Sequence, residues 1–388
     1  MIAIFALSVA FCAYTLFGYP VLLMLLARWR GRPVRKAPHV ATVSVILPVH
    51  IGEGFIAEKL ASIRALAYPQ ELMELLVVCD GTSEATREIV RCFAGLPKLT
   101  IIDLPHGGKA VALNAAIARA TGEILFFTDV RQHLDSASLG NLVDCFADPE
   151  VGVASGELII REPDTLEEAS VGLYWKYEKW IRKQLSRLDS VPGATGCIYA
   201  MRSTLAVTLP PDTLNDDMYL PLGAFFRGYR VIFDSSALAF DYPTALASEF
   251  RRKVRTLAGV YQIVGFFPAL LGPRNRNWIH FFSHKLARLL MPWALLSAGI
   301  SSFFLPAPWN TVAVEAQAGA YLLALAHPAL PSGFPLRRVT APLRTFVVLM
   351  AASLCALAII FVPARVLWKQ TRVSKQQAAG AGSQESEG

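Results

Sequence analysis

A long uncharged stretch near the N-terminus constrains the fold of this chain more than any other feature. Residues 2 to 27, IAIFALSVAFCAYTLFGYPVLLMLLA, carry no charged side chain, and a run of this length can cross a bilayer as one helix. A signal peptide would have a shorter apolar core, a basic start and a small-residue cleavage site. Here the basic residues follow the run, at Arg28, Arg30, Arg32, Arg35 and Lys36. We therefore expect residues 1–29 to form a transmembrane helix whose C-terminal end faces the cytoplasm.

The composition agrees with a membrane protein. Hydrophobic residues make up 54% of the chain and charged residues 17%, whereas soluble domains carry roughly a quarter charged residues. The net charge of +7 fits a cytoplasmic membrane face or a phosphate-bearing ligand. No basic run is interleaved with aromatic residues, so nucleic acid is not expected as a partner. The six cysteines occur singly, which fits neither a zinc site nor a disulfide framework.

Apolar runs return in the C-terminal third of the chain. They cover residues 286 to 305, 311 to 330 and 343 to 363, and predict two to three transmembrane helices between residues 286 and 366. Residues 263–285 begin with an apolar run too short to span a bilayer and are expected to form interfacial helices.

The basic residues after the last apolar run bear on its topology. Three C-terminal spans would leave the tail outside, yet Arg365, Lys369, Arg372 and Lys375 favour the cytoplasmic side. One C-terminal run can therefore be re-entrant or interfacial, and the number of spans stays open. Residues 367–388 are expected to be a disordered tail. Together these signals predict a multi-pass protein of the plasma (inner) membrane with its soluble domain in the cytoplasm.

The stretch between the apolar segments, residues 37–262, predicts an α/β domain. Strand patterns at 42–48, 74–80, 99–104 and 123–129 alternate with helical patterns at 53–67, 83–93 and 108–120. Such alternation predicts an open, mainly parallel sheet with helices on both faces. In sheets of this kind ligands bind at the carboxyl ends of the strands, which is where the most informative residues fall.

Two carboxylates end predicted strands. Asp80 follows ELLVVC and precedes Gly81; it can accept hydrogen bonds from a nucleobase or ribose, or cap an ordinary strand–helix turn. Asp129 follows EILFFT; it can hold Mg²⁺ or Mn²⁺ against a diphosphate, or simply terminate a strand.

Two further segments carry groups suited to phosphate and to proton transfer. HGGKAVALN opens a helix with two glycines and Lys109, a combination that suits phosphate although it is not a Walker motif. Asp216 and Asp217, in LNDDMYLPL, open another helix. They can be simple helix caps, or one of them can be a general base for an incoming hydroxyl.

Taken in order, these segments resemble glycosyltransferase family 2, and in particular its membrane-embedded branch of cellulose, hyaluronan and poly-N-acetylglucosamine synthases. The resemblance covers residues 40 to 262 and rests on VSVILPVH, LLVVCDG, GGKAVALN, GEILFFTD, GATGCIYAMR, NDDMYLPL, GYRVIFD and FRRKVRTLAG. It implies a GT-A fold, which is a Rossmann-like mixed sheet, and an inverting transfer from a nucleotide-diphosphate sugar that is usually uridine-linked. The acceptor implied is a glycan or a lipid-linked molecule, as in polysaccharide biosynthesis.

The resemblance also implies roles for single residues. Asp80 would contact the uracil, and Lys109 would lie near the nucleotide or its phosphates. Asp129 matches the first position of the family's D-x-D motif, which binds Mg²⁺ or Mn²⁺. Asp217 matches the last position of the T-E-D motif and would be the base that activates the acceptor hydroxyl, with Asp216 as its supporting neighbour.

The chain departs from the family pattern in two places. Where D-x-D is expected it reads Asp129-Val130-Arg131, so metal would be held by Asp129 with the diphosphate and another residue, or Arg131 would take over part of the charge. Where processive synthases read Q-x-x-R-W, Arg255 is retained and would reach the diphosphate, while Arg252 and Thr256 replace the Gln and the Trp.

These departures leave three interpretations open. The first is a membrane-bound glycosyltransferase with a lipid-linked or short acceptor. The second is a processive β-glycan synthase coupled to secretion, which the lost Trp disfavours. The third is a catalytically silent nucleotide-sugar-binding subunit, which the altered D-x-D favours and the retained Asp217 and Arg255 oppose.

Other residues give weaker signals. Residues 174 to 188, YWKYEKWIRKQLSRL, predict a basic, aromatic helix that lines the acceptor cleft, rests on lipid headgroups or is an ordinary surface helix. His50, His106 and His133 lack metal-ligand spacing and are expected to be structural or peripheral.

Overall fold

The computed structural model describes residues 1–93, 98–160, 166–242, 246–331 and 334–367. The predicted disordered tail lies almost entirely outside these residues. The chain divides into two compact units. The first unit contains Met1–Trp29, Glu162–Ile181 and Pro243–Thr371, and the second contains Arg30–Arg161, Arg182–Tyr242 and Arg372–Gly388.

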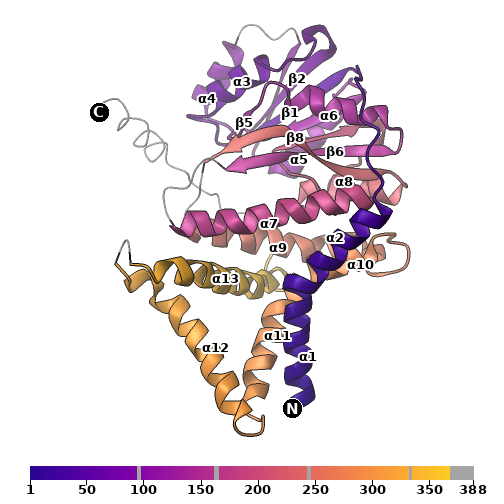
Figure 1. The fold of residues 1–388 in the computed structure, drawn as a ribbon. Coiled ribbons are helices and arrows are strands. Elements are labelled where there is room, and N and C mark those ends of the chain that lie inside the picture. Colours follow the sequence, from indigo (N-terminus) through magenta and orange to yellow (C-terminus); the bar gives the residue numbers. More distant parts are fainter. Residues whose placement is uncertain (94–97, 161–165, 243–245, 332–333, 368–388) are drawn as a thin grey trace. The chain divides into compact units, whose positions relative to one another are not determined.

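An eight-stranded sheet forms the centre of the second unit (Figure 1). Its strands are β1 (Val43–Val49), β2 (Met73–Asp80), β3 (Leu99–Leu104), β4 (Ile124–Thr128), β5 (His133–Leu134), β6 (Val151–Ile160), β7 (Ile198–Arg202) and β8 (Arg230–Asp241). They are arranged in the order β3-β2-β1-β4-β7-β6-β8-β5. The helices of this unit are α3 (Ile56–Arg64), α4 (Glu84–Arg91), α5 (Lys109–Ile117), α6 (Ser138–Val143) and α8 (Asp216–Phe226).

The first four strands are parallel where they pair, as the alternating pattern predicts. β1, β2 and β4 are buried along almost their whole length, which explains their nearly continuous apolar sequences. Ser83 caps α4, because its side-chain oxygen accepts a hydrogen bond from the amide of Thr86. Serine is among the residues preferred at this N-cap position.

The remaining strands make the sheet mixed rather than mainly parallel. β7 runs antiparallel between β4 and β6, and β5 runs antiparallel to β8. Phe127 and Tyr199 are register partners on β4 and β7, and their rings stack with centroids 4.5 Å apart. The mixed sheet agrees with the predicted GT-A architecture.

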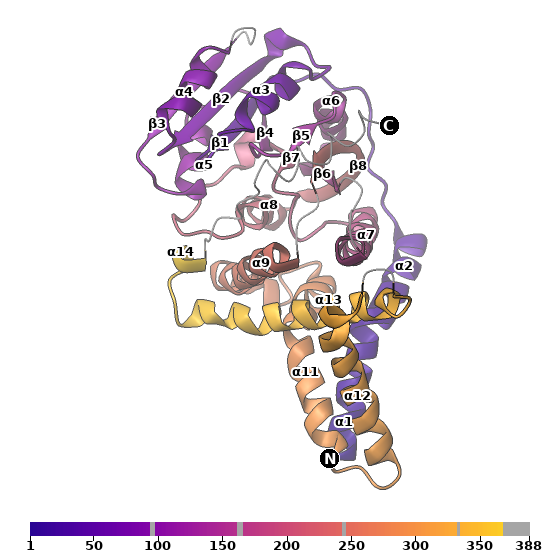
Figure 2. The same cartoon turned by 90° about the vertical axis from the view of Figure 1, so that its left-hand side faces the viewer.

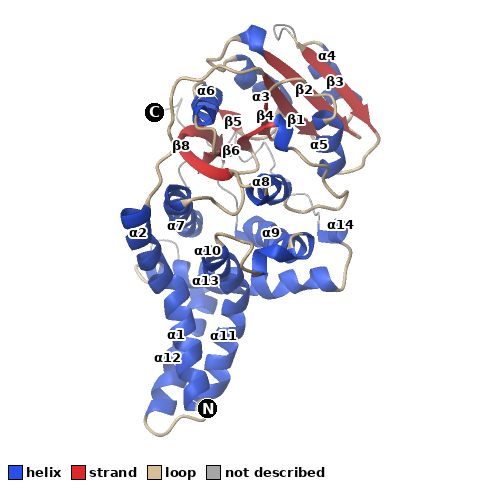
Figure 3. Cartoon of the chain, turned by 90° about the vertical axis from the view of Figure 1, so that its right-hand side faces the viewer, coloured by secondary structure: helices blue, strands red, loops and turns tan. Residues whose placement is uncertain are grey.

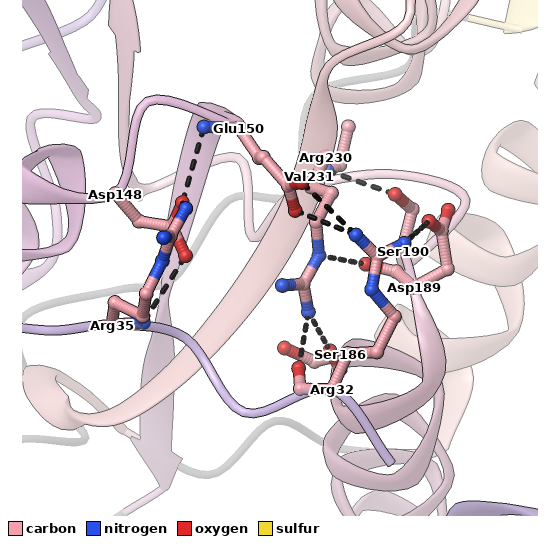
Figure 4. Close-up of polar contacts among 9 residues, drawn as sticks. All are labelled: Arg32, Arg35, Asp148, Glu150, Ser186, Asp189, Ser190, Arg230 and Val231. Atoms are coloured by element: carbon pink, nitrogen blue, oxygen red, sulfur yellow. Dashed lines mark hydrogen bonds and ion pairs between the residues drawn. The ribbon is translucent and has the colours of Figure 1, made fainter. Parts of the chain in front are cut away.

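Polar contacts fix the segment that follows the N-terminal helices onto the second unit (Figure 4). Arg32 forms an ion pair with Glu150 at 2.8 Å, and Arg35 pairs with the buried Asp148 at 3.2 Å. The buried guanidinium of Arg230 donates to the backbone carbonyls of Arg32 and Ser186, at 2.7 and 3.0 Å. These basic residues, read in the sequence as a membrane flank, therefore also make specific contacts within the folded domain.

The first unit is helical. Its helices are α1 (Ile2–Ala13), α2 (Tyr19–Arg30), the N-terminal part of α7 (Leu166–Leu188), α9 (Leu246–Phe266), α10 (Trp278–Phe281), α11 (Ala287–Ser302), α12 (Trp309–Ala326), α13 (Arg337–Cys355) and α14 (Ala364–Leu367). Within it α1 and α11 run side by side, and α12 meets α11 at the turn between them and then diverges from it (Figure 1), whereas α13 lies across α1 and α11 and packs against α9 and α12 (Figures 2 and 3).

Two helical segments among the described residues are long and apolar enough to cross a membrane: Ile2–Arg30 and Arg337–Ile360. The predicted runs at 286 to 305 and 311 to 330 form α11 and α12, which do not reach the same combination of length and hydropathy. The expected short interfacial run at 263 to 272 is divided between the end of α9 and a single 3₁₀ turn, Pro268–Leu271.

Candidate active site

The carboxyl edge of the sheet brings together three of the predicted site residues. Lys109 is the first residue of α5, Asp129 follows β4 and Asp216 opens α8. The Lys109 Nζ lies 3.0 Å from Asp129 Oδ1 and 3.1 Å from Asp216 Oδ2. Three elements distant in sequence therefore converge on one ammonium group.

The carboxylates determine the charge state of Lys109. Burial acts to lower its pKa, but the negative charges of Asp129, Asp216 and Asp217 outweigh this and raise the pKa above the ordinary lysine value. The ammonium is therefore charged throughout the neutral range. Of its two ion-pair partners, Asp129 has a side chain that is 36% exposed and Asp216 one that is 8% exposed. Asp129 is thus the carboxylate that remains open to a ligand.

Asp217 lies beside the GATGC segment. An added Cβ at Gly196 would come within 3.1 Å of Asp217 Oδ2, so the glycine leaves room for this carboxylate. The amide of Ala194 donates to the carbonyl of Asp217 at 2.6 Å. The start of α8 and the segment before β7 therefore fit around each other, and Asp217 is less buried than its neighbour Asp216.

Asp80 organises the turn that precedes Lys109. Its side chain is buried; Oδ1 accepts a hydrogen bond from the Gly107 amide at 2.6 Å, and Oδ2 accepts one from Gly108 at 3.0 Å. Gly108 has φ of +88°, a left-handed conformation that favours glycine. Asp80 thus holds the loop that delivers Lys109 to the sheet edge.

Two histidines gather around Asp80. The rings of His50 and His106 stack with centroids 4.1 Å apart. His106 Nδ1 lies 3.1 Å from Asp80 Oδ2, and His50 Nδ1 lies 2.7 Å from the Asp80 carbonyl oxygen. One ligand atom from each of these three residues falls within 4.8 Å of the others, so the group could hold a metal ion.

Spacing along the chain does not reveal this histidine pair, but topology does. His50 directly follows β1, and His106 comes two residues after β3, so both stand at the carboxyl edge. His133 begins β5 and is exposed, away from any such group among the described residues.

Arg131, the residue that replaces the second Asp of D-x-D, forms an ion pair with Asp241. Asp241 is the last residue of β8 and is buried. It also accepts a hydrogen bond from Gln132 Nε2 at 2.8 Å. Sequence reasoning missed Asp241, because the pairing depends on β8 returning to the same edge as β4.

Sequence reasoning also missed Lys59, on α3. Its side chain is 1% exposed, and its Nζ donates to Thr128 Oγ1 and to the Gln132 carbonyl, each at 2.6 Å. Burial lowers the pKa of Lys59 to about 7, although the neighbouring Cys197 and Asp129 act in the opposite direction. A lysine within EKLAS looks like a surface residue of a helix, so its sequence context gives no signal.

The predicted diphosphate residue Arg255 lies on α9, in the first unit, together with Arg252 and Thr256. Arg252 pairs with the buried Glu249 at 2.5 Å. It also lies over the ring of Trp175, 4.7 Å from its centroid. A tryptophan from α7 therefore packs on the helix that lacks the motif Trp.

Comparisons with known proteins bear on the family to which the sheet domain is related. Residues 44–207 match the family described as Glycosyl transferase family 2. A probable glycosyltransferase, YdaM, from Bacillus subtilis (strain 168) is 24% identical over 269 residues, 66% of this chain and 62% of that protein. Poly-beta-1,6-N-acetyl-D-glucosamine synthase from Staphylococcus aureus (strain MSSA476) is 22% identical over 277 residues, 69% of this chain and 67% of that protein. The aligned region thus spans about three-fifths to two-thirds of these relatives.

A solved structure resembles almost the whole chain. The mannosyltransferase PcManGT from Pyrobaculum calidifontis, in complex with GDP-Man and Mn²⁺, superposes with a TM-score of 0.69 at 25% identity and covers 90% of this chain and 99% of that one. The sheet, the sequence match and this likeness agree. Residues 44–207 therefore form a glycosyl transferase family 2 domain of the GT-A fold, which makes the chain similar to glycosyltransferases.

Proposed function

We propose that the protein transfers a sugar from a nucleotide-diphosphate sugar to a hydroxyl of a lipid-linked or glycan acceptor, with inversion at the anomeric carbon. The observation that carries the proposal is the convergence of Lys109, Asp129 and Asp216 at the carboxyl edge of a GT-A sheet. The family resemblance favours a uridine nucleotide. The solved relative is in complex with GDP-Man, so a guanosine nucleotide is the competing donor.

The donor diphosphate would lie against Lys109 and the amino end of α5. Departure of a nucleoside diphosphate develops negative charge, which a positioned cation stabilises. Lys109 is held in place by two carboxylates, and its pKa is raised, so it is both fixed and charged. Asp80 would reach the nucleobase with the acceptor capacity left after its contacts to Gly107, Gly108 and His106, because a carboxylate offers about four lone-pair sites.

The donor set at Asp129 fits a divalent ion. Mg²⁺ and ions like it commonly bind through one or two carboxylates plus substrate phosphates and waters, and Asp129 is the open carboxylate beside Lys109. We therefore propose that Asp129 holds Mg²⁺ or Mn²⁺ together with the diphosphate. Such an ion supplies charge neutralisation to the leaving group. Arg131 would act on the other side of this segment through its ion pair with Asp241.

Asp217 is the proposed general base. It is the more open of the two adjacent acids at the start of α8, and the glycine at position 196 leaves space next to its carboxylate. A positioned base contributes about 10²–10⁴-fold to rate. Asp216 would support it by fixing Lys109. Arg255 is proposed from the resemblance alone as a further cation for the diphosphate.

We also propose a multi-pass location in the plasma (inner) membrane with the sheet domain in the cytoplasm. The packing of α1 along α11, and the return of α12 from the far end of α11 (Figure 1), support three spans, and the crosswise α13 supports an interfacial position. Three spans would place the chain after α13 in the cytoplasm, in agreement with its basic residues. A fluorescent protein fused after Gly388 should then fluoresce, whereas an alkaline phosphatase fusion at the same point should be inactive. An active phosphatase fusion would contradict this topology.

A processive β-glycan synthase is the second candidate. It is favoured by the likeness to poly-beta-1,6-N-acetyl-D-glucosamine synthase. The residue at the place of the motif Trp is Thr256, whose hydroxyl donates to the Arg252 carbonyl at 2.8 Å, so this position offers no aromatic face to a sugar. The length of the product separates the two candidates.

The test is a donor screen on detergent-purified protein with Mg²⁺ or Mn²⁺, reading the release of nucleoside diphosphate in the presence of native membrane lipids as the acceptor source. Asp217→Asn is the matched variant, and Glu123→Gln, an exposed carboxylate just before β4, is the control. Turnover with one donor that Asp217→Asn abolishes and Glu123→Gln retains is the expected result. Donor binding without turnover in wild type would favour a silent binding subunit.

A further inference from the structure

The segment that carries Asp129 and Arg131 is closed at its base by one lysine side chain. The Lys59 Nζ donates to the side chain of Thr128, just before this segment, and to the backbone carbonyl of Gln132, just after it. Both hydrogen bonds measure 2.6 Å. A single side chain therefore joins the two ends of a short loop whose middle faces the ligand side of the sheet.

The same contact extends to the neighbouring strand. The Thr128 hydroxyl donates to the carbonyl of Cys197 at 2.9 Å, just before β7. Lys59 thus links α3, the end of β4 and the GATGC segment beside Asp217. On the opposite side of the loop, Asp241 binds the side chains of Arg131 and Gln132. The loop is held from two directions, and Asp129 is left between them.

Burying the Lys59 side chain in the core costs free energy, which is expected only where its amine holds other groups in place. Its neighbours on α3, Leu60 and Ile63, are fully buried apolar residues, and an apolar side chain would fill the position without the penalty of burying a polar amine. The two hydrogen bonds of the Lys59 Nζ go to the residues that bracket Asp129 and Arg131.

We propose that Lys59 is a positioning residue that fixes the Asp129–Arg131 loop in the geometry that binds the donor diphosphate. It acts through Thr128 and the Gln132 carbonyl, without touching the substrate. The part of this inference that concerns the diphosphate rests on the proposed function; the part that concerns the loop does not.

The first experiment measures the loop directly. Amide hydrogen exchange is followed for a peptide spanning residues 124 to 134 in the full-length wild type, in Lys59→Met and in Ile63→Val. Lys59→Met keeps a side chain of similar shape and removes both hydrogen bonds, so exchange in this peptide should become at least tenfold faster. Ile63→Val perturbs the same helix without removing either hydrogen bond and should leave the rate nearly unchanged. Equal exchange in wild type and Lys59→Met would overturn the proposal.

The second experiment measures the consequence for the ligand. UDP is titrated in the presence of Mn²⁺, and Lys59→Met should bind about tenfold more weakly than wild type and Ile63→Val. Thr128→Val removes one of the two contacts and should give a smaller loss. The double variant should be no weaker than Lys59→Met, because both changes open the same clamp. Equal affinity in wild type and Lys59→Met overturns the role in donor binding.

The two experiments also separate this inference from the proposed function. If wild type binds neither UDP nor GDP, the proposed function fails, and the exchange measurement still decides whether Lys59 positions the loop. If wild type binds UDP and Lys59→Met loses only thermal stability, with exchange and affinity unchanged, Lys59 is a packing residue and the inference is wrong.

Discussion

Two carboxylates in this domain occupy comparable places at the ends of parallel strands and have different surroundings. Asp80, at the end of β2, is buried and accepts hydrogen bonds from the amides of Gly107 and Gly108. Asp129, after β4, is more than a third exposed and pairs with the ammonium of Lys109. The first carboxylate is largely occupied by the chain itself, whereas the second remains open to a ligand.

The difference shows that position at a strand end does not fix what a residue does. Asp80 shapes a loop, and through that loop it sets where Lys109 begins its helix. Asp129 would meet the ligand directly, while Lys59 and Asp241 hold its loop from behind. Binding would then depend on the Asp80 region mainly through geometry and on the Asp129 region mainly through charge. Four predictions sharpen or break this distinction.

Asp129→Asn should have the largest effect on the reaction. It removes the open carboxylate while leaving Lys109 paired with Asp216, and we expect turnover to fall about 10²–10³-fold, the range seen when one electrostatic group of an active site is lost. Thermal unfolding should change little. Steady-state release of nucleoside diphosphate provides the measurement, with Glu123→Gln as the control. Retained turnover in Asp129→Asn would remove Asp129 from the chemistry.

Asp80→Asn should act on stability first. An amide at this position offers one acceptor oxygen where the carboxylate offers two, so a buried amide of the glycine turn loses its partner. We expect a loss of about 1–3 kcal/mol in unfolding free energy, and a rise in the donor KM that exceeds the fall in kcat. Abolished turnover with unchanged unfolding would show that Asp80 acts on the ligand and not on the loop.

Lys59 and Lys109, which both lie near Asp129, should contribute to the pH dependence of folding stability in opposite directions. The pKa of Lys59 is lowered to about 7 in the folded state, against about 10.4 in an unfolded chain. Between these values the unfolded chain binds the extra proton, so stability rises with pH, by up to about 1.4 kcal/mol per pH unit. The pKa of Lys109 is raised, so its contribution is fully present below the unfolded value and is lost only at higher pH.

The measurement is thermal unfolding of wild type and Lys59→Met between about pH 7 and 9. In this window Lys59, unlike Lys109, binds its proton to a different extent in the folded and unfolded states. The difference in unfolding free energy between the two proteins should shift by about 2 kcal/mol in favour of wild type across that window. A constant difference would mean that Lys59 is charged in the fold at pH 9.

The two glycines of the Asp80 region should give the smallest effects, and unequal ones. An added Cβ at Gly108 meets nothing within 4 Å, so Gly108→Ala should cost only the backbone strain at φ +88° and ψ 167°, about 1–3 kcal/mol. An added Cβ at Gly81 would lie 2.8 Å from His106 Cβ at φ +63°, so Gly81→Ala should cost more. Thermal unfolding of the two variants tests which of them loses more stability. A larger loss in Gly108→Ala than in Gly81→Ala would contradict the packing of His106 on this turn.

The sequence was sufficient for the parts of the structure that depend on local pattern. Strand ends and helix starts are marked by alternating apolar runs, by the Ser83 cap and by the glycines before Lys109, so the parallel half of the sheet follows from them. The cluster of Lys109, Asp129 and Asp216 was implied by family resemblance and by the rule that parallel strands share a carboxyl edge.

The parts that were missed depend on which strands become neighbours. The ion pair of Arg131 with Asp241 requires β8 to return to the edge that holds β4, and no local pattern specifies that return. The stacking of His50 on His106 requires β1 and β3 to end at one edge on either side of β2. The burial of Lys59 depends on how α3 packs on the sheet, and its surrounding sequence resembles that of a surface helix.

The most direct test of the account is a titration of UDP and GDP, with Mn²⁺, into purified wild type and Lys109→Met. The account predicts that wild type binds one of the two nucleotides, and that the loss of the ammonium between Asp129 and Asp216 weakens binding at least tenfold while the protein stays folded. If folded Lys109→Met binds the same nucleotide as tightly as wild type, the donor diphosphate does not lie at this edge of the sheet, and the proposed active site is wrong.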